Sequence, residues 1–470
     1  MSSETNTSQP VSRLPRDLGT VESYAALIGI LIGAGIFKVT SDAGAITGPS
    51  VILSYLILMP AILATSIPYA AFISTPLGRE PGGEYLHISR TLGGFGLAYV
   101  GSWLKIIAYV GAAAYLADAL ASYVIELSGR RLSGELAHQS LAIGSLLFFY
   151  LVHVVGVRWF GRIQVAMCIV LGFSIIVLVV PGLFAIHTAN YSPFFTHGAG
   201  GLALSFIPLF FSYAGFESLA QTAGETKDST RRLPLVFLRG ISATAVVFVL
   251  MSIVAFGVLP LSQIQASGTP MTEVAMKYLP WGAASLVTLG AIMAITTSLN
   301  PTLIVPSRLA LIFVEDGLAP SWLGSVNRRT ATPVVALTLN LFACLALLIS
   351  RQLSLALNIA VFALVLLYFL HSLAFLLLPR FNPELNRQIT INMPVWLQRL
   401  AAWISVLSMG GLILVQVLRD LRTLQSTSLS ERISAHSLTS VELAIVWSAV
   451  GVGLYALARM MKKKSSNAGE

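Results

Sequence analysis

The sequence predicts an all-α polytopic membrane protein with about 12 transmembrane helices, two of them broken at mid-membrane. Three observations support this fold class. Of the 470 residues, 56% are hydrophobic and only 10% are charged, and the mean hydropathy is +0.80, whereas a soluble protein carries about a quarter charged residues. The hydrophobic residues gather in runs of roughly 20, the length that crosses a bilayer. Glycines interrupt two of these runs near their centres.

The expected spans follow one another through almost the whole chain, separated by short polar connections. They cover residues 20–45, 49–74, 95–127, 139–156, 160–186, 201–224, 234–259, 280–313, 332–350, 353–379, 395–418 and 438–461. An even number of spans places both termini on one side. Most of the 29 lysine and arginine residues fall on that side, so the positive-inside rule places both termini in the cytoplasm. We therefore expect a multi-pass protein of the plasma (inner) membrane.

The first span contains the segment Gly29-Ile30-Leu31-Ile32-Gly33-Ala34-Gly35. Each glycine in a helix interior costs roughly 1 kcal/mol relative to alanine, and it leaves the backbone uncovered. Uncovered backbone survives at membrane depth only where it is buried in protein or lines a wet cavity. We interpret the segment as half of a substrate site, with a half-helix beginning near Gly35 that directs its positive end at an anion. Close helix packing on small residues explains the glycines equally well.

The sixth span contains a second glycine interruption, in Tyr213-Ala214-Gly215-Phe216-Glu217. If spans 1–5 and 6–10 are repeats, Gly33 and Gly215 occupy matching positions, and such paired interruptions indicate a transporter's binding site. Because five is odd, the repeats are inverted. The chain then divides into a cytoplasmic tail (1–18), a first repeat (19–187), a second repeat (188–380), two C-terminal spans (381–461) and a basic cytoplasmic tail (462–470).

Several motifs together resemble the amino acid–polyamine–organocation superfamily of secondary transporters. They are Ile32-Gly33-Ala34-Gly35-Ile36-Phe37, Pro81-Gly82-Gly83-Glu84-Tyr85, Tyr213-Ala214-Gly215-Phe216-Glu217 with Glu225 and Lys227, and Ser307-Arg308 with Glu315-Asp316-Gly317-Leu318-Ala319-Pro320. The resemblance extends across spans 1–10. It implies a leucine-transporter-like 5+5 inverted repeat with two extra C-terminal helices, and an amino acid or related amine as cargo. The motifs do not identify the substrate.

An amino acid zwitterion needs one partner for each of its charges. Amides at Gly33, Ala34 and Gly35 suit the carboxylate, because they would lie at the start of a half-helix. Carbonyls of Gly29 and Ile32, and those near Tyr213 and Gly215, suit the ammonium. The aromatic candidates for selecting the substrate side chain are Phe210, Phe211, Phe216, Tyr109 and Tyr368. Each could instead be packing, and Phe216 is favoured because it adjoins the break. A small or apolar neutral side chain is expected.

Two charged residues within the spans are candidates for coupling. Glu217 follows the second break, where it could be a proton- or substrate-linked acid or a local cap. Lys105 in span 3 could extend its side chain to the membrane surface or carry a proton at a lowered pKa. Direct pairing of Lys105 with Asp118 is not expected, because 13 helical residues span about 20 Å. We expect Glu225 to be a solvated gate or loop partner near the inner surface. We expect Lys38 to pair with Asp42 or, alternatively, to add positive charge at the outer gate.

A set of hard oxygens in span 8 predicts a sodium site. Pro301 cannot donate to the carbonyl of Thr297, and the hydroxyls of Thr297 and Ser298 would lie beside the carbonyls of Gly29 and Ile32. In sodium-coupled relatives, the resemblance implies, two hydroxyl residues stand ten and eleven positions before a basic residue, as Ser298 and Thr297 do before Arg308. Many proton-coupled relatives carry a lysine in span 5, and residues 165–180 contain none. These points favour Na+ over H+; the alternative is local hydroxyl bonding within span 8.

The predicted function is a secondary active transporter, a permease that moves amino acids by alternating access. Spans 1, 2, 6 and 7 would rock against spans 3, 4, 8 and 9, as the resemblance implies. The alternatives are an exchanger or facilitator, a polyamine or amine transporter, and a nutrient sensor. No cofactor is expected beyond Na+ or H+ as coupling ion, and no nucleic acid partner. The sequence leaves the oligomeric state open, and enzyme motifs such as a phosphate loop or nucleophile elbow are absent from it.

Overall fold

The structure is a computed structural model that describes residues 15–129, 131–132, 134–267, 269–350, 353–434 and 438–467. Within those ranges the side chains of 34, 38, 41, 281, 353–358 and 461–467 are not described. The described chain consists of helices and connections, with a single isolated bridge between Leu18 and Thr226. This architecture confirms the predicted all-α class.

Eleven helical segments in the described ranges are long and apolar enough to cross a membrane, and α14 (Val334–Ile349) is a shorter apolar helix. Together they match the predicted number of about twelve. The unbroken long helices are α3 (Val51–Ile73), α5 (Gly96–Leu127), α6 (Glu135–Val155), α7 (Val157–Gly182), α10 (Ser229–Val258), α13 (Trp281–Glu315), α15 (Leu353–Phe381), α17 (Val395–Ser426) and α19 (Ser440–Asn467).

The first span is broken at the predicted glycines. Helix α1 (Thr20–Ala34) ends in a kink at Gly33, whose φ is 22° and ψ is −144°. A five-residue π-helix, Gly35–Val39, and then α2 (Thr40–Thr47) continue the chain. A side chain is strained at this φ, and a Cβ on Gly33 would lie 2.0 Å from the Ser298 Oγ. Glycine is therefore required at the break for both reasons.

The sixth span is broken in the same way. Helix α8 (Gly198–Tyr213) ends before Ala214, which is extended with φ −76° and ψ 153°. Gly215 follows with φ 102°, a conformation that glycine adopts readily. The one-turn helix α9 (Ser218–Gln221) and the 3-10 turn Ala223–Glu225 complete the span. Both interruptions predicted from the sequence are thus present in the backbone.

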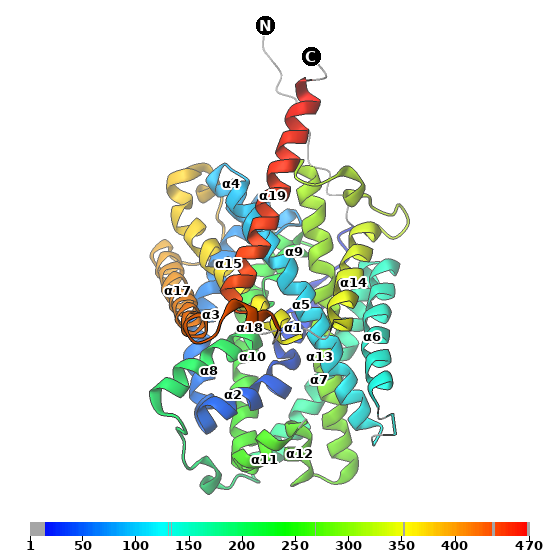
Figure 1. The fold of residues 1–470 in the computed structure, drawn as a ribbon, viewed down its shortest axis with the longest axis vertical. Helices are drawn as coiled ribbons and strands as arrows, with labels where there is room; N and C mark the ends of the chain where they lie inside the picture. The colour runs from blue at the N-terminus through cyan, green and yellow to red at the C-terminus, as the bar shows by residue number, and fades with distance from the viewer. Residues whose placement is uncertain are drawn as a thin grey trace.

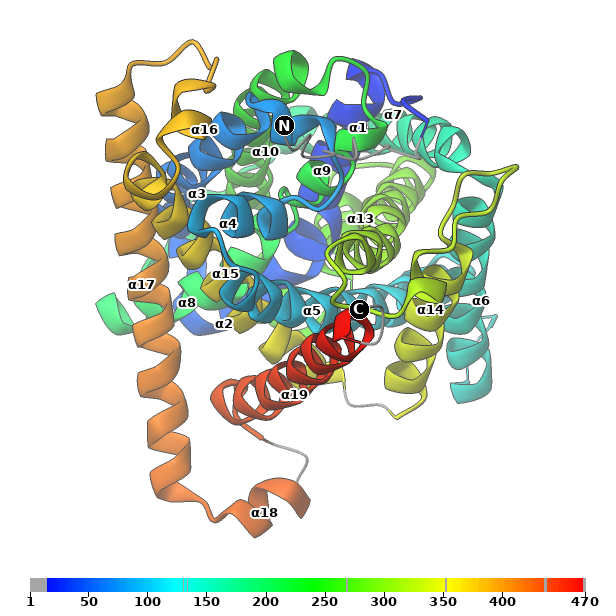
Figure 2. The same ribbon diagram turned by 90° about the horizontal axis from the view of Figure 1, so that it is seen from above.

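The long helices pack side by side into one bundle (Figure 1). The short helices α11 (Leu261–Ala266) and α12 (Pro270–Met276) lie at one end. Helices α4 (Glu84–Leu92) and α16 (Pro383–Arg387) lie at the other end. Seen from that end, α17 and α19 are peripheral, while α5, α13 and α15 are close to the centre (Figure 2).

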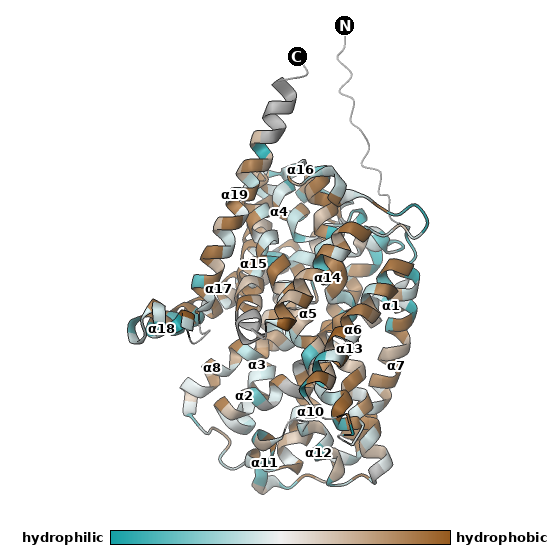
Figure 3. Ribbon diagram, turned by 45° about the vertical axis from the view of Figure 1, so that its right-hand side comes forward, coloured by the Kyte–Doolittle hydropathy of each residue, from teal (hydrophilic) through white to brown (hydrophobic). Residues whose placement is uncertain are grey.

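The outside of the bundle is apolar over much of its height (Figure 3). Phe148, Ile169 and Phe342, on α6, α7 and α14, are 55%, 68% and 62% exposed. Large apolar side chains in such numbers on a surface suit lipid rather than water. Polar side chains such as Lys105, Gln164 and Glu217 are instead buried inside the bundle. The chain is therefore a multi-pass membrane protein that buries several polar side chains inside an otherwise apolar bundle.

Candidate functional site

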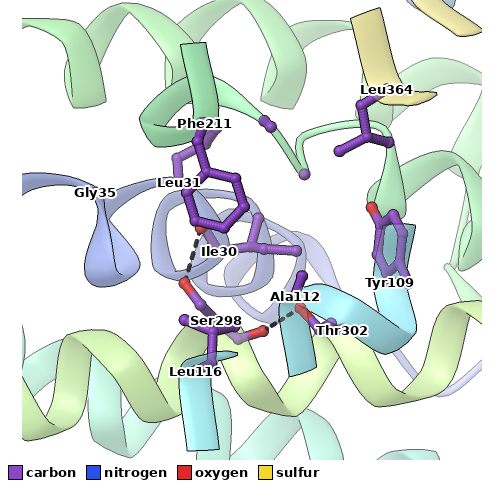
Figure 4. Close-up of a pocket in the computed structure, with 12 residues that line it drawn as sticks. Ile30, Leu31, Gly35, Tyr109, Ala112, Leu116, Phe211, Ser298, Thr302 and Leu364 are labelled. Atoms are coloured by element: carbon purple, nitrogen blue, oxygen red, sulfur yellow. Dashed lines mark hydrogen bonds between the residues drawn. The ribbon is translucent and has the colours of Figure 1, made fainter. Parts of the chain in front are cut away.

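A cavity lies between the two helix breaks and the middle of α5, α13 and α15 (Figure 4). It is lined by Ile30, Leu31, Gly35, Tyr109, Ala112, Leu116, Phe211, Ala214, Gly215, Ser298, Thr302 and Leu364. It contains about 430 Å³ of space outside protein atoms, open solvent included. Both breaks therefore face one space.

The glycines of the two breaks leave no room for side chains. A Cβ on Gly35 would lie 2.7 Å from the Ser212 Cβ, and one on Gly215 would lie 2.9 Å from the Ile30 Cδ1. Both glycines line the cavity, as does Tyr109 from α5. Of the residues that the sequence assigns to the substrate, these three and Phe211 are placed directly at the cavity. Ala34 adjoins them in the chain, but its side chain lies outside the described residues.

The aromatic residues near the second break are arranged differently from the prediction. Phe211 lines the cavity, while the ring of Phe210 packs against Tyr368 with 5.6 Å between centroids. Phe216 packs behind the break, 5.0 Å from the Tyr368 ring, so the preference for Phe216 is not supported. The Tyr213 hydroxyl donates to the carbonyl of Tyr55. Successive helical residues point about 100° apart, which is why Phe211 faces the cavity and its neighbour Phe210 does not.

The amide expected to meet a substrate carboxylate is partly used within the first break. The Gly35 N–H donates to the Ile32 carbonyl, because the chain turns sharply at Gly33. This bond occupies the donor of Gly35 that the sequence assigns to the substrate. The Lys38 side chain lies outside the described residues, so its predicted pairing with Asp42 does too.

Glu217 is held from three directions at the second break. Its Oε2 accepts the Gly215 N–H at 3.0 Å and a hydroxyl hydrogen bond from Tyr368, and its Oε1 accepts the Tyr109 hydroxyl at 2.7 Å. The first bond fixes the break locally, although the Glu217 side chain makes no capping hydrogen bond to α9. The bond to Tyr109 links the carboxylate to a residue of the cavity wall. Glu217 thus lies one side chain behind the cavity.

Lys105 pairs with a residue that the sequence analysis does not name as its partner. Its Nζ lies 2.9 and 3.0 Å from the two carboxylate oxygens of Glu84 on α4, and 3.9 Å from the Glu217 Oε1. It is fully buried, so it does not extend to the membrane surface. Tyr69 and Gln221 each donate to Glu84 at 2.9 Å. Glu84, Lys105 and Glu217 form a single buried cluster.

The charges of this cluster do not balance when all three groups are ionised. Glu84, Lys105 and Glu217 are 1%, 0% and 0% exposed. Two carboxylates and one ammonium leave an excess negative charge, and an unpaired buried charge costs several kcal/mol. Burial raises the pKa of the Glu84 carboxyl, an effect that the Lys105 ammonium opposes. The cluster is therefore chemically suited to bind one proton.

The oxygens expected to bind Na+ converge, but not in the expected set. The Thr297 and Ser298 hydroxyls each donate to the Gly29 carbonyl at 3.1 Å. Ser298 also donates at 2.8 Å to the carbonyl of Ile30, rather than that of Ile32. Ile32 instead accepts from Gly35.

An amide group lies among these oxygens. The Nε2 of Gln164, on α7, donates to the Thr297 carbonyl at 2.8 Å and to the Ala25 carbonyl at 3.2 Å. Its Oε1 accepts from Asn300 at 2.8 Å. The carbonyl freed by Pro301 is therefore already paired with a neutral donor. A bound Na+ that used the Thr297 carbonyl would have to displace the Gln164 amide, and the sodium site stays a prediction.

The end of the bundle that carries α4 is closed by contacts between distant motifs. Arg308, on α13, pairs with Glu225 at 2.6 Å, and both side chains are buried. The expectation that Glu225 is solvated is wrong, because the bundle encloses it with this partner. Asp316 pairs with Arg90 at 3.0 Å and accepts the Tyr85 hydroxyl at 2.6 Å. The motifs that carry the family resemblance thus meet in space.

Comparison with known proteins decides the family. The sequence profile of the amino acid permease family matches residues 18–429, which include both breaks, the cavity and the buried cluster. The chain belongs to the amino acid permease family. Its members are permeases rather than enzymes, in agreement with the lack of catalytic motifs in the sequence.

The relatives of this permease differ in what their names say they carry. Over 323 residues it is 28% identical to cationic amino acid transporter 1 of Arabidopsis thaliana, a match that covers 66% of this chain and 53% of the relative. It is 25% identical to a branched-chain amino acid permease and 27% identical to a methylthioribose transporter, both of Bacillus subtilis. These matches cover 69% and 70% of this chain and 72% and 74% of the relatives. The chain thus spans about half of the plant relative's length.

The sequence does not reveal the roles of two residues of the site. Glu84 is quoted only as part of a motif, and Gln164 is not considered. Both are polar side chains that the fold buries completely. A polar residue inside or beside an apolar span is a signal of function, and Gln164 stands at the start of the apolar run 165–180.

Proposed function

We propose that this permease is a secondary active transporter that moves neutral amino acids across the plasma (inner) membrane by alternating access. The observation that carries the proposal is the single cavity faced by both helix breaks. Interrupted helices at matching positions of two repeats mark the substrate site of transporters. Backbone groups at the breaks carry no net charge, which suits a zwitterion, and the Gly35 and Gly215 amides would bind it after release from their present partners.

The cavity wall favours a substrate with an apolar side chain. Its side chains are mostly apolar, including Ile30, Leu116 and Leu364, and Tyr109, Ser298 and Thr302 supply hydroxyls. A cationic side chain would need a carboxylate that reaches the cavity. The nearby Glu217 is instead occupied by Tyr109, Tyr368 and the Gly215 amide. A branched-chain or similar neutral amino acid is the proposed cargo.

The proposed coupling ion is a proton, bound by the cluster of Glu84, Lys105 and Glu217. The cluster has one carboxylate more than it has ammonium groups, so a single proton neutralises it. Through Tyr109, Glu217 touches the cavity wall, so substrate binding and protonation can affect each other. Na+ is favoured by the sequence, but the Gln164 amide pairs with the Thr297 carbonyl that the ion would need.

The proposed motion opens the substrate path first at one end of the bundle and then at the other. Glu225 follows the broken sixth span and Arg308 belongs to span 8, which the family resemblance assigns to different moving parts. Their buried pair would have to separate for the path to open at the end of the bundle that carries α4. In the proposed topology this end faces the cytoplasm, with both termini, because it carries the excess of arginine and lysine.

Uptake into proteoliposomes tests the proposal. Radiolabelled leucine should accumulate when the outside is more acidic than the inside, and a Na+ gradient at equal pH should have no effect. Accumulation driven by Na+ alone would contradict proton coupling. Uptake that depends on neither gradient would show an exchanger or facilitator. Binding of leucine without flux would show a sensor.

A further inference from the structure

A second hollow, rich in arginine, lies at the end of the bundle that carries α4, away from the substrate cavity. Five arginines line it: Arg16, Arg79, Arg231, Arg232 and Arg239. They come from the chain just before α1, from the 3-10 turn Pro76–Arg79 after α3, and from the first turns of α10. The hollow holds about 1280 Å³ of space outside protein atoms, open solvent included.

The charge of this hollow is poorly compensated. Its acidic lining residue is Asp228, which pairs with Arg232 at 3.0 Å. Arg232 also donates to the Thr20 hydroxyl, and Arg16 donates to the carbonyl of Arg79. Within the described part of the chain, the guanidinium groups of Arg231 and Arg239 have no hydrogen-bonded or ion-pair partner. Several guanidinium groups gathered around one space repel one another, and an anion between them would relieve that repulsion.

The backbone adds to the positive field. Helix α10 has 30 residues and begins at Ser229, and the Asp228 side chain makes no capping hydrogen bond to it. Ser229 and Thr230 line the hollow, so the positive end of the helix dipole faces the same space as the arginines. Helix N-termini and arginine forks both favour phosphate oxygens, through N–H groups and through bidentate pairing.

The surface next to the hollow favours a lipid as the source of the phosphate. Leu235 lies one helical turn from both Arg231 and Arg239, and it is 50% exposed. Val246, about three turns beyond Leu235 on the same face, is 53% exposed. This face of α10 therefore passes from arginines to exposed apolar side chains, in the order of headgroup and acyl chain. A freely soluble phosphate has no acyl chain that could contact the apolar side chains of this face.

We propose that the hollow binds the phosphate headgroup of an anionic phospholipid in the membrane leaflet at this end of the bundle. Basic pockets between transmembrane helices bind such headgroups in other membrane proteins. The lipid would hold together the start of α1 (span 1), the end of α3 (span 2) and the start of α10 (span 7). It would thus stabilise these spans as one unit. This inference goes beyond the proposed transport function and does not depend on it.

Lipid binding by the full-length protein in detergent tests the proposal. Phosphatidylglycerol should raise the midpoint of thermal unfolding, whereas phosphatidylcholine and inorganic phosphate should not. In the double variant Arg231→Gln/Arg239→Gln the apparent affinity for phosphatidylglycerol should fall about 30-fold. Arg387→Gln/Arg399→Gln, which removes two exposed arginines elsewhere, should keep wild-type affinity. Binding of the wild-type protein should also weaken as salt concentration rises.

Three results would overturn the proposal. One is an equal affinity of the double variant and the wild-type protein. The second is a stabilisation by inorganic phosphate as large as that by phosphatidylglycerol, which would assign the hollow to a soluble anion. The third is equal binding of phosphatidylcholine. If the double variant does not fold, native mass spectrometry of the single variant Arg239→Gln tests the proposal instead. This variant should retain fewer phosphatidylglycerol molecules than Arg399→Gln, and equal numbers would overturn the proposal.

Discussion

At the scale of single residues, Gly33 carries two constraints at once. Its φ of 22° strains a side chain, and a Cβ would lie 2.0 Å from the Ser298 Oγ. Strained backbone of this kind costs about 1–3 kcal/mol and persists where the surrounding structure determines it. The position therefore ties the shape of the first break to the wall of the cavity.

Replacing Gly33 tests this constraint. Gly33→Ala should lower the initial rate of amino acid uptake at least about fivefold, since about 1 kcal/mol or more of strain falls on the substrate site. Gly172→Ala is the matched control, because a Cβ there would meet nothing within 4 Å. The measurement is the initial uptake rate of each variant, divided by the amount of reconstituted protein. Equal rates for the two variants would argue against a functional break at Gly33.

Glu217 is the residue whose protonation matters most for coupling. Glutamine at position 217 keeps the shape of the side chain and removes its negative charge. Glu217→Gln should abolish leucine accumulation driven by a pH gradient, because the remaining Glu84 and Lys105 already balance. The exposed Glu384→Gln should accumulate leucine as the wild-type protein does. Full accumulation by Glu217→Gln would place the coupled proton elsewhere.

At the scale of elements, α4 brings buried titratable groups to one end of the bundle. Its His87 donates to or accepts from His371 at 2.9 Å, and burial, helped by the Lys105 ammonium, lowers the pKa of His87 to about 3. The ordinary pKa is about 6.5, so the unfolded chain binds a proton here that the folded one does not. This residue therefore makes the fold less stable as the pH falls from about 6.5 toward 3.

The pH dependence of unfolding checks this effect. Each pH unit in that range should cost the wild-type protein up to about 1.4 kcal/mol through His87. Thermal midpoints measured between pH 7 and 4 should fall more steeply for the wild-type protein than for His87→Gln. Parallel slopes would show that the pKa of His87 is the same in the folded and the unfolded protein.

Helix α7 contributes through Gln164, which joins α1 to α13. Gln164→Leu should lower the free energy of unfolding by about 1–3 kcal/mol, because it leaves the Thr297 carbonyl and the Asn300 amide without their partner. Denaturation of the purified protein measures this, with the exposed Gln388→Leu as the control. Exchanging Na+ for choline should not change the wild-type midpoint. A Na+-dependent rise would instead support the sodium site predicted from the sequence.

The fold was predictable because its signals are local. Apolar runs of the right length mark the spans, and glycines mark both breaks. The site was predictable only in part, because it depends on helix phase and on contacts between distant elements. Phase decides that Phe211 rather than Phe210 faces the cavity. The pairing of Lys105 with Glu84 depends on how α4 folds back onto α5, and spacing along the sequence does not show it.

At the scale of the whole molecule, buried ion pairs hold the end of the bundle that carries α4. Removing one partner of a buried pair typically costs 3–5 kcal/mol. Arg308→Gln should therefore weaken the closed arrangement that Glu225 and Arg308 maintain. Arg90→Gln breaks a partly exposed pair with Asp316, and exposed pairs are worth only about 0–1 kcal/mol.

Distances between spin labels report this change. Labels are placed on Lys227→Cys, in the connection after the broken sixth span, and on Arg328→Cys, in the connection after α13, with Cys168 and Cys344 replaced by serine. Arg308→Gln should add a population at longer distance, and Arg90→Gln should add little. Identical distributions for both variants and the parent would mean that the buried pair does not control opening.

The central claim is that backbone groups at two helix breaks bind a zwitterion. Calorimetric titration with leucine and with its two single-charge analogues tests it most directly. Isoamylamine lacks the carboxylate, and 4-methylpentanoate lacks the ammonium. The account predicts that leucine binds, that neither analogue binds measurably, and that Gly33→Ala weakens leucine binding. Binding of isoamylamine as tight as that of leucine would contradict it and identify an amine transporter.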